Sequence, residues 1–199
     1  MSKLFFESIK VVGGDAQNLE MHRYRVLTTT KYFFGKCLDI PFETIVRNQI
    51  DLYSDFQFNK IYKLRVVYSD IVEKVELLEY FPKKIRSLKI VEADIDYSYK
   101  WNNRDHINEL YNLRGECSDV LIVKNGLITD TSYANIVLSK DGDFFTPKKP
   151  LLNGTKRLLM LSKGLIKECD ITPEDIALYN SCYLINSMLD MYPIDEIVY

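Results

Sequence analysis

Two residues of this sequence, a lysine and an aspartate, have types and neighbours that could support chemistry. Lys100 stands between Tyr99 and Trp101 just ahead of a predicted helix, and Asp130 ends a predicted strand and is followed by hydroxyl side chains and an amide. About thirty residues separate them, and each lies at the end of a regular element. Binding and catalytic residues are common at such places, so this amine and this carboxylate could face one cavity.

The elements that must position these two residues show strand and helix patterns from the start of the chain. Alternating apolar residues predict strands, and apolar residues at helical spacing predict helices. The expected strands span residues 4–12, 63–68 and 75–80, and the expected helices span residues 21–34 and 42–52. Up to about residue 83, we therefore expect an α/β lobe with a mainly antiparallel sheet.

The rest of the chain is richer in strands, and both Lys100 and Asp130 fall within it. Expected strands span residues 86–93, 120–123, 135–139, 144–146 and 181–185, with helices at 104–117, at 153–163 and from Thr172 onwards. The Asn125-Gly126 pair predicts a tight hairpin. The fold class is therefore α/β (α+β), and we expect two lobes, residues 1–85 and residues 86–199.

Composition argues against several classes of protein. The chain has 199 residues, of which 47% are hydrophobic, and a formal net charge of −2. Charges of both signs are interspersed, unlike the basic stripe of a nucleic-acid-binding chain, and no apolar run approaches the ~20 residues of a membrane helix. The N-terminus becomes charged too early for a signal peptide. The four cysteines form no Cys-x-x-Cys pair. We expect a cytoplasmic protein with neither nucleic acid nor membrane as a partner.

Neither histidine has the neighbours that a metal site would need. His22 and His106 have no cysteine or acidic residue at a spacing typical of metal ligands. We therefore expect both histidines to be structural, and we expect no metal.

Three segments together are similar to one enzyme family. They are Lys-x-x-Asn-Arg at residues 100–104, DVLIVKNGLITDTSYANIVL, and TPKKPLLNGTKRLLML. The chain resembles the class IV (fold type IV) pyridoxal-phosphate enzymes, which include branched-chain and D-amino-acid aminotransferases and 4-amino-4-deoxychorismate lyase. The Lys-x-x-Asn-Arg form looks most like the lyase. The resemblance implies a small N-terminal α/β lobe, a larger cofactor-binding lobe that is mixed and β-barrel-like with helices, and a homodimer.

The resemblance also implies roles for Lys100 and Asp130. Lys100 would form the Schiff base with pyridoxal 5'-phosphate and then carry a proton during catalysis. Asp130 would keep the pyridine nitrogen protonated, although most relatives have a glutamate there, which is one methylene longer. Without the resemblance, Lys100 would be one exposed lysine among many, and Asp130 would be an aspartate that begins a turn.

The phosphate of the cofactor would be held by residues from both lobes. By resemblance, Arg25 of the His22-x-x-Arg25 motif pairs with the phosphate, as a planar guanidinium can. Gly154 and Thr155 open a helix whose N-terminus favours an anion. Ser187 aligns with a further phosphate contact. The alternatives are a surface arginine on an amphipathic helix for Arg25 and a serine that closes a strand for Ser187.

Four further residues are candidates for binding the substrate. Asn103 and Arg104 complete the lyase-like motif, and the alternative for them is a helix start capped by Asn103. Asn135 matches a family asparagine and could either brace the site or touch the substrate. Lys10 stands where many relatives have an arginine that could bind a substrate carboxylate.

Three functions are compatible with these residues. The first is an aminodeoxychorismate lyase, which converts 4-amino-4-deoxychorismate to 4-aminobenzoate and pyruvate on the way to folate. The second is an aminotransferase acting on a branched-chain or D-amino acid, with the same lysine and cofactor. The third is a binding protein that kept the fold and lost catalysis. For either enzyme, the partner is a small-molecule amino substrate.

Overall fold

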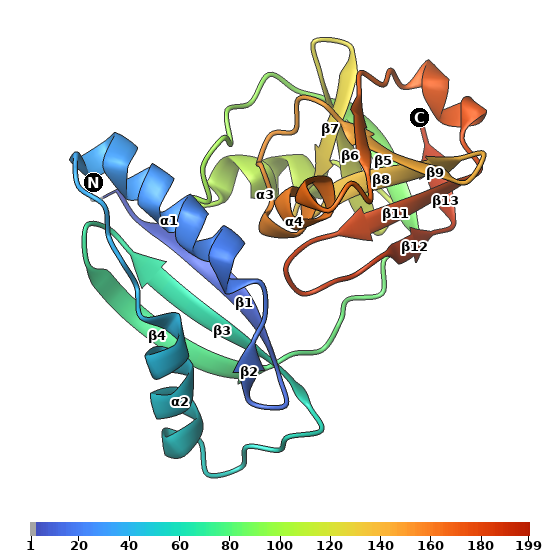
Figure 1. The fold of residues 1–199 in the computed structure, drawn as a ribbon. Helices are drawn as coiled ribbons and strands as arrows, with labels where there is room; N and C mark the ends of the chain where they lie inside the picture. The colour runs from blue at the N-terminus through green and yellow to red at the C-terminus, as the bar shows by residue number, and fades with distance from the viewer. Residues whose placement is uncertain (1–2) are drawn as a thin grey trace. The chain divides into compact units, whose positions relative to one another are not determined.

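The computed structural model describes residues 3–199, and contacts within the chain divide it into two compact units. The first unit contains the residues up to Pro82 together with Tyr99–Asn103, and the second contains Lys83–Ser98 and Arg104–Tyr199. The mixed α/β fold expected from the sequence is confirmed (Figure 1). The predicted division placed residues 86–199 in one lobe, whereas Tyr99–Asn103 packs with the first unit.

The first unit is an antiparallel sheet with two helices. Its strands are in the order β2-β1-β3-β4, and every neighbouring pair is antiparallel. The elements are β1 (Phe5–Val12), β2 (Asp15–Ala16), α1 (Leu19–Phe34), α2 (Phe42–Leu52), β3 (Ile61–Tyr68) and β4 (Val72–Glu79). The helices and longer strands lie where the apolar patterns predicted them, so local patterning is sufficient to specify this unit.

Alternation along β1 decides which of its side chains enter the core. Phe5, Glu7, Ile9 and Val11 are all buried and lie on one face of the strand. The apolar members of this set pack against Val26 of α1 and the first turns of α2, and Figure 1 shows α1 lying along β1. A glutamate at one of these inward positions needs charged or hydrogen-bonding partners inside the core.

The second unit is built on a mixed sheet that branches. Its main strand order is β10-β9-β8-β7-β6-β5-β13, and β11 pairs with both β8 and β12. Its elements are β5 (Ser87–Glu92), α3 (Asp105–Asn112), β6 (Asp119–Lys124), β7 (Leu127–Thr131), β8 (Asn135–Lys140), β9 (Asp143–Pro147), α4 (Thr155–Ser162), β10 (Lys167–Cys169), the 3₁₀ helix η1 (Glu174–Leu178), β11 (Ser181–Ile185), β12 (Tyr192–Ile194) and β13 (Glu196–Val198).

The strands of the second unit do not form the β-barrel-like lobe that the family resemblance implies. Across residues 3–199 the strand path is open, with β10 and β13 at its ends and no closed barrel. The cause lies at β8, which pairs with β7 only through Asp130 and Asn135, with β9 near its end, and with β11 along residues 135–139. Because β8 exchanges neighbours along its length, the sheet branches there rather than closing.

Several local predictions are confirmed, and others differ. The Asn125-Gly126 turn joins β6 to β7, with both residues at positive φ (53° and 73°), as this tight turn requires. The expected helix at 104–117 ends at Asn112, ahead of Gly115 at φ 59°. The expected helix after Thr172 is the short 3₁₀ helix η1. The strands β2, β10, β12 and β13 were missed because two or three residues are too few to show alternation.

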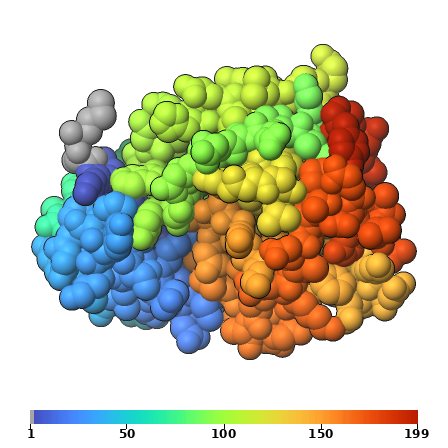
Figure 2. All heavy atoms as spheres, turned by 90° about the horizontal axis from the view of Figure 1, so that it is seen from above, coloured from blue at the N-terminus to red at the C-terminus, as the bar shows by residue number. Residues whose placement is uncertain are grey.

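The surface of the second unit includes α3. His106 and Glu109 of this helix are largely exposed, with side-chain exposures of 86% and 73%, and the green segment that contains α3 lies at the surface in Figure 2. Within residues 3–199, no helix has both the length and the apolar character that a membrane crossing would need.

Candidate functional site

Lys100 lies on a segment that extends the sheet of the first unit. The backbone N–H of Phe6 donates to the carbonyl of Lys100 (3.0 Å), and the N–H of Asn102 donates to the carbonyl of Leu4 (2.8 Å). An antiparallel bridge joins Phe5 to Trp101. The Lys100 side chain is half-buried, with Nζ 5.2 Å from the centre of the Phe6 ring. The predicted reactive amine is therefore carried on a backbone fixed to β1.

A buried ionic cluster joins β1 to α1. The Arg25 guanidinium donates through Nε to Glu7 Oε1 (2.8 Å) and through Nη2 to Glu7 Oε2 (2.5 Å). His22 Nδ1 lies 2.5 Å from the same Oε2. His22 and Arg25 are three residues apart, so both face β1 from one side of α1.

Burial and charge act in opposite directions on this cluster. Burial favours protonated Glu7, but the Arg25 charge and the hydrogen bond from His22 outweigh it, and the pKa of Glu7 falls from 4.5 to about 2. For His22, burial lowers the pKa, and the neighbouring Arg25 and Lys100 charges add to this effect, although Glu7 opposes it. At neutral pH the cluster therefore contains an ionised Glu7, a charged Arg25 and a neutral His22.

Sequence reasoning missed Glu7, although a signal was present. Within the FFESIKVV strand, Glu7 shares its face with Phe5 and Ile9, so alternation alone places its carboxylate in the core. A buried carboxylate requires a partner, and the His22-x-x-Arg25 pattern on the next helix offers two. Arg25 was predicted to bind phosphate, and this role stays a prediction; in the structure its guanidinium is oriented by Glu7.

Lys10 and Arg65 lie on strands of the same unit. Lys10 is half-buried and is paired in register with Lys63 of β3. Arg65, which the sequence analysis did not consider, stacks its guanidinium 4.0 Å from the centre of the Phe6 ring and donates from Nη2 to Asn102 Oδ1 (2.8 Å). Arg65 therefore braces the segment that carries Lys100. The candidate Asn103 is exposed.

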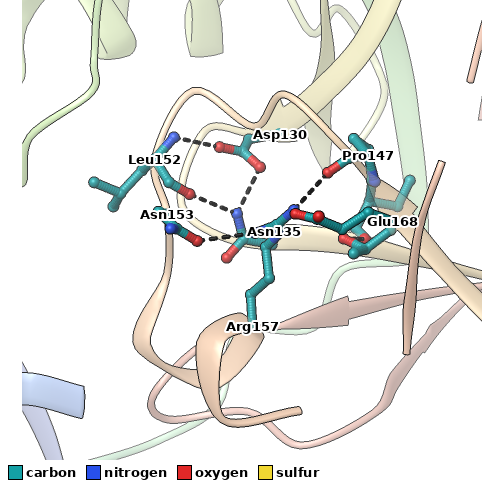
Figure 3. Close-up of polar contacts among 9 residues, drawn as sticks. Asp130, Asn135, Pro147, Leu152, Asn153, Arg157 and Glu168 are labelled. Atoms are coloured by element: carbon teal, nitrogen blue, oxygen red, sulfur yellow. Dashed lines mark hydrogen bonds and ion pairs between the residues drawn. The ribbon is translucent and has the colours of Figure 1, made fainter. Parts of the chain in front are cut away.

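In the second unit, Asp130 is buried at the end of β7 with both carboxylate oxygens hydrogen-bonded. Oδ1 accepts from Asn135 Nδ2 (2.7 Å), and Oδ2 accepts from the backbone N–H of Leu152 (2.8 Å) (Figure 3). An ionised carboxylate can accept about four hydrogen bonds. Asp130 is therefore an acceptor of the kind that the ring-nitrogen contact predicted from the family requires.

Gly154 ends the turn that precedes α4, and its lack of a side chain is required by Asn135. A Cβ atom on Gly154 would lie 2.1 Å from Asn135 Oδ1, which is well inside van der Waals contact. Thr155, the first residue of α4, is buried. The first N–H groups of a helix have no partners within the helix and attract anions. The residues at this turn therefore fit a phosphate group.

Arg157, which the sequence analysis did not single out, holds the same turn from within α4. Its guanidinium donates from Nη1 to Asn153 Oδ1 (2.9 Å), and from Nη2 to the carbonyl of Pro147 (2.8 Å) and to Glu168 Oε1 (2.6 Å). The side chain is 2% exposed. Figure 3 shows it reaching from α4 towards Pro147 and Glu168. Most arginines are exposed, so nothing in the sequence indicated that this one is buried.

Arg104 stabilises the loop that follows Asp130. It donates from Nη2 to the carbonyl of Ser132 (2.6 Å), and its Nε is buried with no hydrogen-bond partner among residues 3–199. Ser132 in turn donates from Oγ to Asp119 Oδ2 (3.0 Å). Burial raises the pKa of Asp119, and hydrogen bonds from Val120 and Ser132 partly offset this. Arg104 acts on the loop here, and its predicted contact with the substrate stays a prediction.

Ser187 lies in the turn after β11 and is half-buried. The neighbouring Asn186 fixes this turn, because its Oδ1 accepts the N–H groups of Met188 (2.8 Å) and Leu189 (2.9 Å).

The predicted site residues fall into two groups, one in each unit. The first unit brings together Lys10, Arg25, Lys100 and Asn103, and the second brings together Arg104, Asp130, Asn135, Gly154, Thr155 and Ser187. A side-chain hydrogen bond joins Asp130 to Asn135, and Asn135 Oδ1 lies where a Cβ atom on Gly154 would be. The first group contains an amine and an oriented guanidinium, and the second contains a carboxylate and a turn suited to an anion.

Comparison with known proteins identifies relatives of this chain. Residues 109–197 match the model of the family described as amino-transferase class IV. A protein of Haemophilus influenzae of uncharacterised function is 32% identical over 184 residues, which cover 92% of this chain and 96% of that protein.

Solved structures show the same fold. A Haemophilus somnus protein provisionally named a 4-amino-4-deoxychorismate lyase is 30% identical, with 94% of this chain and 97% of that one covered and a TM-score of 0.85. A Mycobacterium tuberculosis protein described as a hypothetical aminotransferase, solved in a form with bound pyridoxal phosphate, is 16% identical and shares the fold, with 98% and 81% covered and a TM-score of 0.74. With relatives at 30–32% identity over nearly its whole length, the chain belongs to the class IV aminotransferase family.

Proposed function

We propose that this protein is a pyridoxal-phosphate enzyme that converts 4-amino-4-deoxychorismate to 4-aminobenzoate and pyruvate. The observation that carries the proposal is the likeness at 30% identity to the Haemophilus somnus protein, with 97% of that chain covered. The Lys-x-x-Asn-Arg motif at residues 100–104 also supports the lyase. Family membership supports the cofactor, and two structures of the same fold, from Mycobacterium tuberculosis and Brucella abortus, contain bound pyridoxal phosphate.

The side chains fit this cofactor. The Gly154 turn packs against Asn135 Oδ1 where a Cβ atom would lie, and it leads directly into the N-terminus of α4, where a phosphate is favoured. Asp130 is a buried carboxylate suited to a protonated ring nitrogen, and Lys100 is an amine on a fixed backbone. When bound, pyridoxal phosphate supplies an aldehyde that reacts with amines and a ring that withdraws electrons from the bonds next to the substrate nitrogen.

Each residue of the chain would then have a defined task. The Lys100 amine would hold the cofactor covalently and would later move a proton from the carbon that bears the substrate amine. The Asp130 carboxylate would hold a proton at the ring nitrogen. Arg25, oriented by Glu7, would pair with phosphate oxygens through its guanidinium, and the N–H groups at Gly154 and Thr155 are donors suited to a phosphate. Ser187 would add a hydroxyl donor.

Two measurements test the cofactor and the reaction separately. Purified protein loaded with pyridoxal phosphate should absorb near the visible edge, and borohydride reduction followed by peptide mass mapping should locate the adduct on Lys100. Lys100→Arg should abolish the adduct, whereas Lys149→Arg, at an exposed lysine, should leave it unchanged. Loaded protein given 4-amino-4-deoxychorismate should release 4-aminobenzoate. A loaded protein that yields none above background excludes the lyase.

An aminotransferase is the second candidate, because the family model that matches residues 109–197 is that of the class IV aminotransferases. A branched-chain or D-amino acid should then change the absorption spectrum of the bound cofactor, and a keto acid should restore it. A colourless protein that takes up no cofactor would instead support a binding protein that retained the fold.

We also propose that the protein is a cytoplasmic homodimer that acts in folate biosynthesis. The family resemblance supports the dimer, and the lyase reaction supplies the link to folate. Light scattering of the purified protein should give twice the 23.3 kDa chain mass, and a monomer mass would exclude the dimer.

A further inference from the structure

The Asn135 amide lies where β7, β8 and the turn before α4 meet. Its Nδ2 donates to Asp130 Oδ1 (2.7 Å) and to the carbonyl of Leu152 (2.9 Å). The N–H of Leu152 donates back to Asp130 Oδ2 (2.8 Å). These three bonds form a closed ring between one carboxylate, one side-chain amide and one backbone residue, as Figure 3 shows.

The donor and acceptor pattern specifies an asparagine at this position. Both partners of Nδ2 are acceptors, so the NH₂ group must face them, and the two N–H bonds of Nδ2 match the two partners. The amide oxygen must then point away from them, and it lies against Gly154. An aspartate would place a second negative charge beside Asp130 and lacks the donors, and a glutamine would extend one methylene further in a site that is 5% exposed.

We infer that Asn135 is a positioning residue that couples the Asp130 carboxylate to the turn carrying Gly154 and Thr155. The inference rests on the proposed function, in which Asp130 serves the ring nitrogen and the turn serves the phosphate. The Asn135 amide binds both Asp130 and the Leu152 carbonyl, and Asp130 also binds the Leu152 N–H, so the two ends of the cofactor site respond together. A change at Asp130 should therefore alter anion binding at the turn, although the Asp130 carboxylate itself would not contact the anion.

The substitution Asp130→Asn exposes this coupling. An asparagine keeps one acceptor oxygen, but its NH₂ group must face either the Nδ2 of Asn135 or the N–H of Leu152, and both are donors. One of the three bonds is therefore lost. The new NH₂ group and the donor that it faces are then buried without an acceptor. The turn should then become more mobile, and its affinity for a phosphate should fall.

A double-mutant cycle tests the coupling with two readouts that do not require activity. Hydrogen exchange of the apo protein, followed in a peptide covering residues 150–156, reports on the turn. The dissociation constant of pyridoxal phosphate reports on the site. Asp130→Asn and Asn135→Ser should each speed exchange in this peptide and weaken binding about tenfold, and the double variant should be no more than about twofold worse than either single variant.

Control variants separate positioning from a general loss of stability. Asn180→Ser removes another asparagine hydrogen bond, in which Oδ1 accepts from the N–H of Asp141 in the β8–β9 turn (3.1 Å), and should leave both readouts unchanged. Gly154→Ala should lower the melting temperature, because its Cβ meets Asn135 Oδ1. Adding Asn135→Ser removes that oxygen and should restore much of the melting temperature, while exchange in the turn stays fast.

Three outcomes would overturn the inference. The first is a double variant whose effects equal the product of the single effects, and the second is a turn with unchanged exchange in Asn135→Ser. The third is a Gly154→Ala, Asn135→Ser variant that regains both stability and wild-type exchange, because Asn135 would then serve packing alone. If the wild-type protein takes up no pyridoxal phosphate, the proposed function fails, and the exchange data on the apo protein still decide the coupling.

Discussion

The charge on Glu7 should make a large and pH-dependent contribution to the stability of the first unit. Both oxygens of its carboxylate are held by Arg25, and one also contacts His22, in a core position with no exposed surface. In Glu7→Gln, an NH₂ group would replace one acceptor and face donors, and the Arg25 charge would lose its counter-ion. Removing one partner of a buried ion pair is strongly destabilising.

The size of the effect follows from the pKa of Glu7. Its fall from 4.5 to about 2 corresponds to about 3 kcal/mol of folding free energy at neutral pH. Because the folded-state pKa is the lower one, this stabilisation is complete above about pH 4.5 and is lost as the pH falls towards 2. Glu7→Gln should therefore be destabilised by about 3 kcal/mol or more at pH 7, and the difference from wild type should narrow in acid.

Denaturant unfolding at a series of pH values between 7 and 3 measures both quantities. The chain has a single tryptophan, Trp101, which belongs to the first unit, with its ring 4.5 Å from that of Phe5, so its fluorescence reports on this unit. The control is Glu43→Gln, which removes an ion pair between the exposed Glu43 and the half-buried Arg23, and should change stability little.

The reasoning is refuted if the difference in free energy of unfolding between wild type and Glu7→Gln stays the same from pH 7 to pH 3. A cost for Glu43→Gln as large as that for Glu7→Gln would also refute it, because burial would then not be the source of the effect.

Three further predictions concern the second unit. Arg157→Gln should destabilise the protein by about 3 kcal/mol in thermal unfolding, and more than Glu168→Gln, because Glu168 is 43% exposed and Arg157 is 2% exposed. Arg104→Lys should speed hydrogen exchange at residues 131–134, because the contact with the Ser132 carbonyl is lost; unchanged exchange would contradict this role. Gly126→Ala should cost about 1 kcal/mol through its positive φ alone, since no atom lies within 4 Å of the added Cβ, and Gly126→Asn should cost less.

Much of the fold could be predicted from the sequence. The helices α1 and α2 and the strands β1, β3, β5 and β6 lie within a few residues of their predicted places, because apolar periodicity is a local property of the chain. The Asn125-Gly126 hairpin is equally local. The short edge strands, the branch at β8 and the membership of Tyr99–Asn103 in the first unit depend on pairing between distant segments and were not predictable.

The candidate site divides in the same way. Sequence motifs identified Lys100, Arg25, Asp130 and Gly154 as residues to examine, and the inward register of Glu7 was visible in the alternation of β1. Motifs cannot show which donor meets which acceptor, because this depends on packing that brings together residues distant in sequence.

The sequence alone determined the residue types and their order: an amine after a strand-rich segment, a carboxylate ending β7, and a glycine before α4. Tertiary structure decided that Glu7 orients Arg25 from 18 residues away and that Asn135 ties Asp130 to a turn 17 residues further on. The physical reason is that a buried hydrogen bond or ion pair needs both partners within about 3 Å in the right orientation, and only the packed fold fixes that geometry.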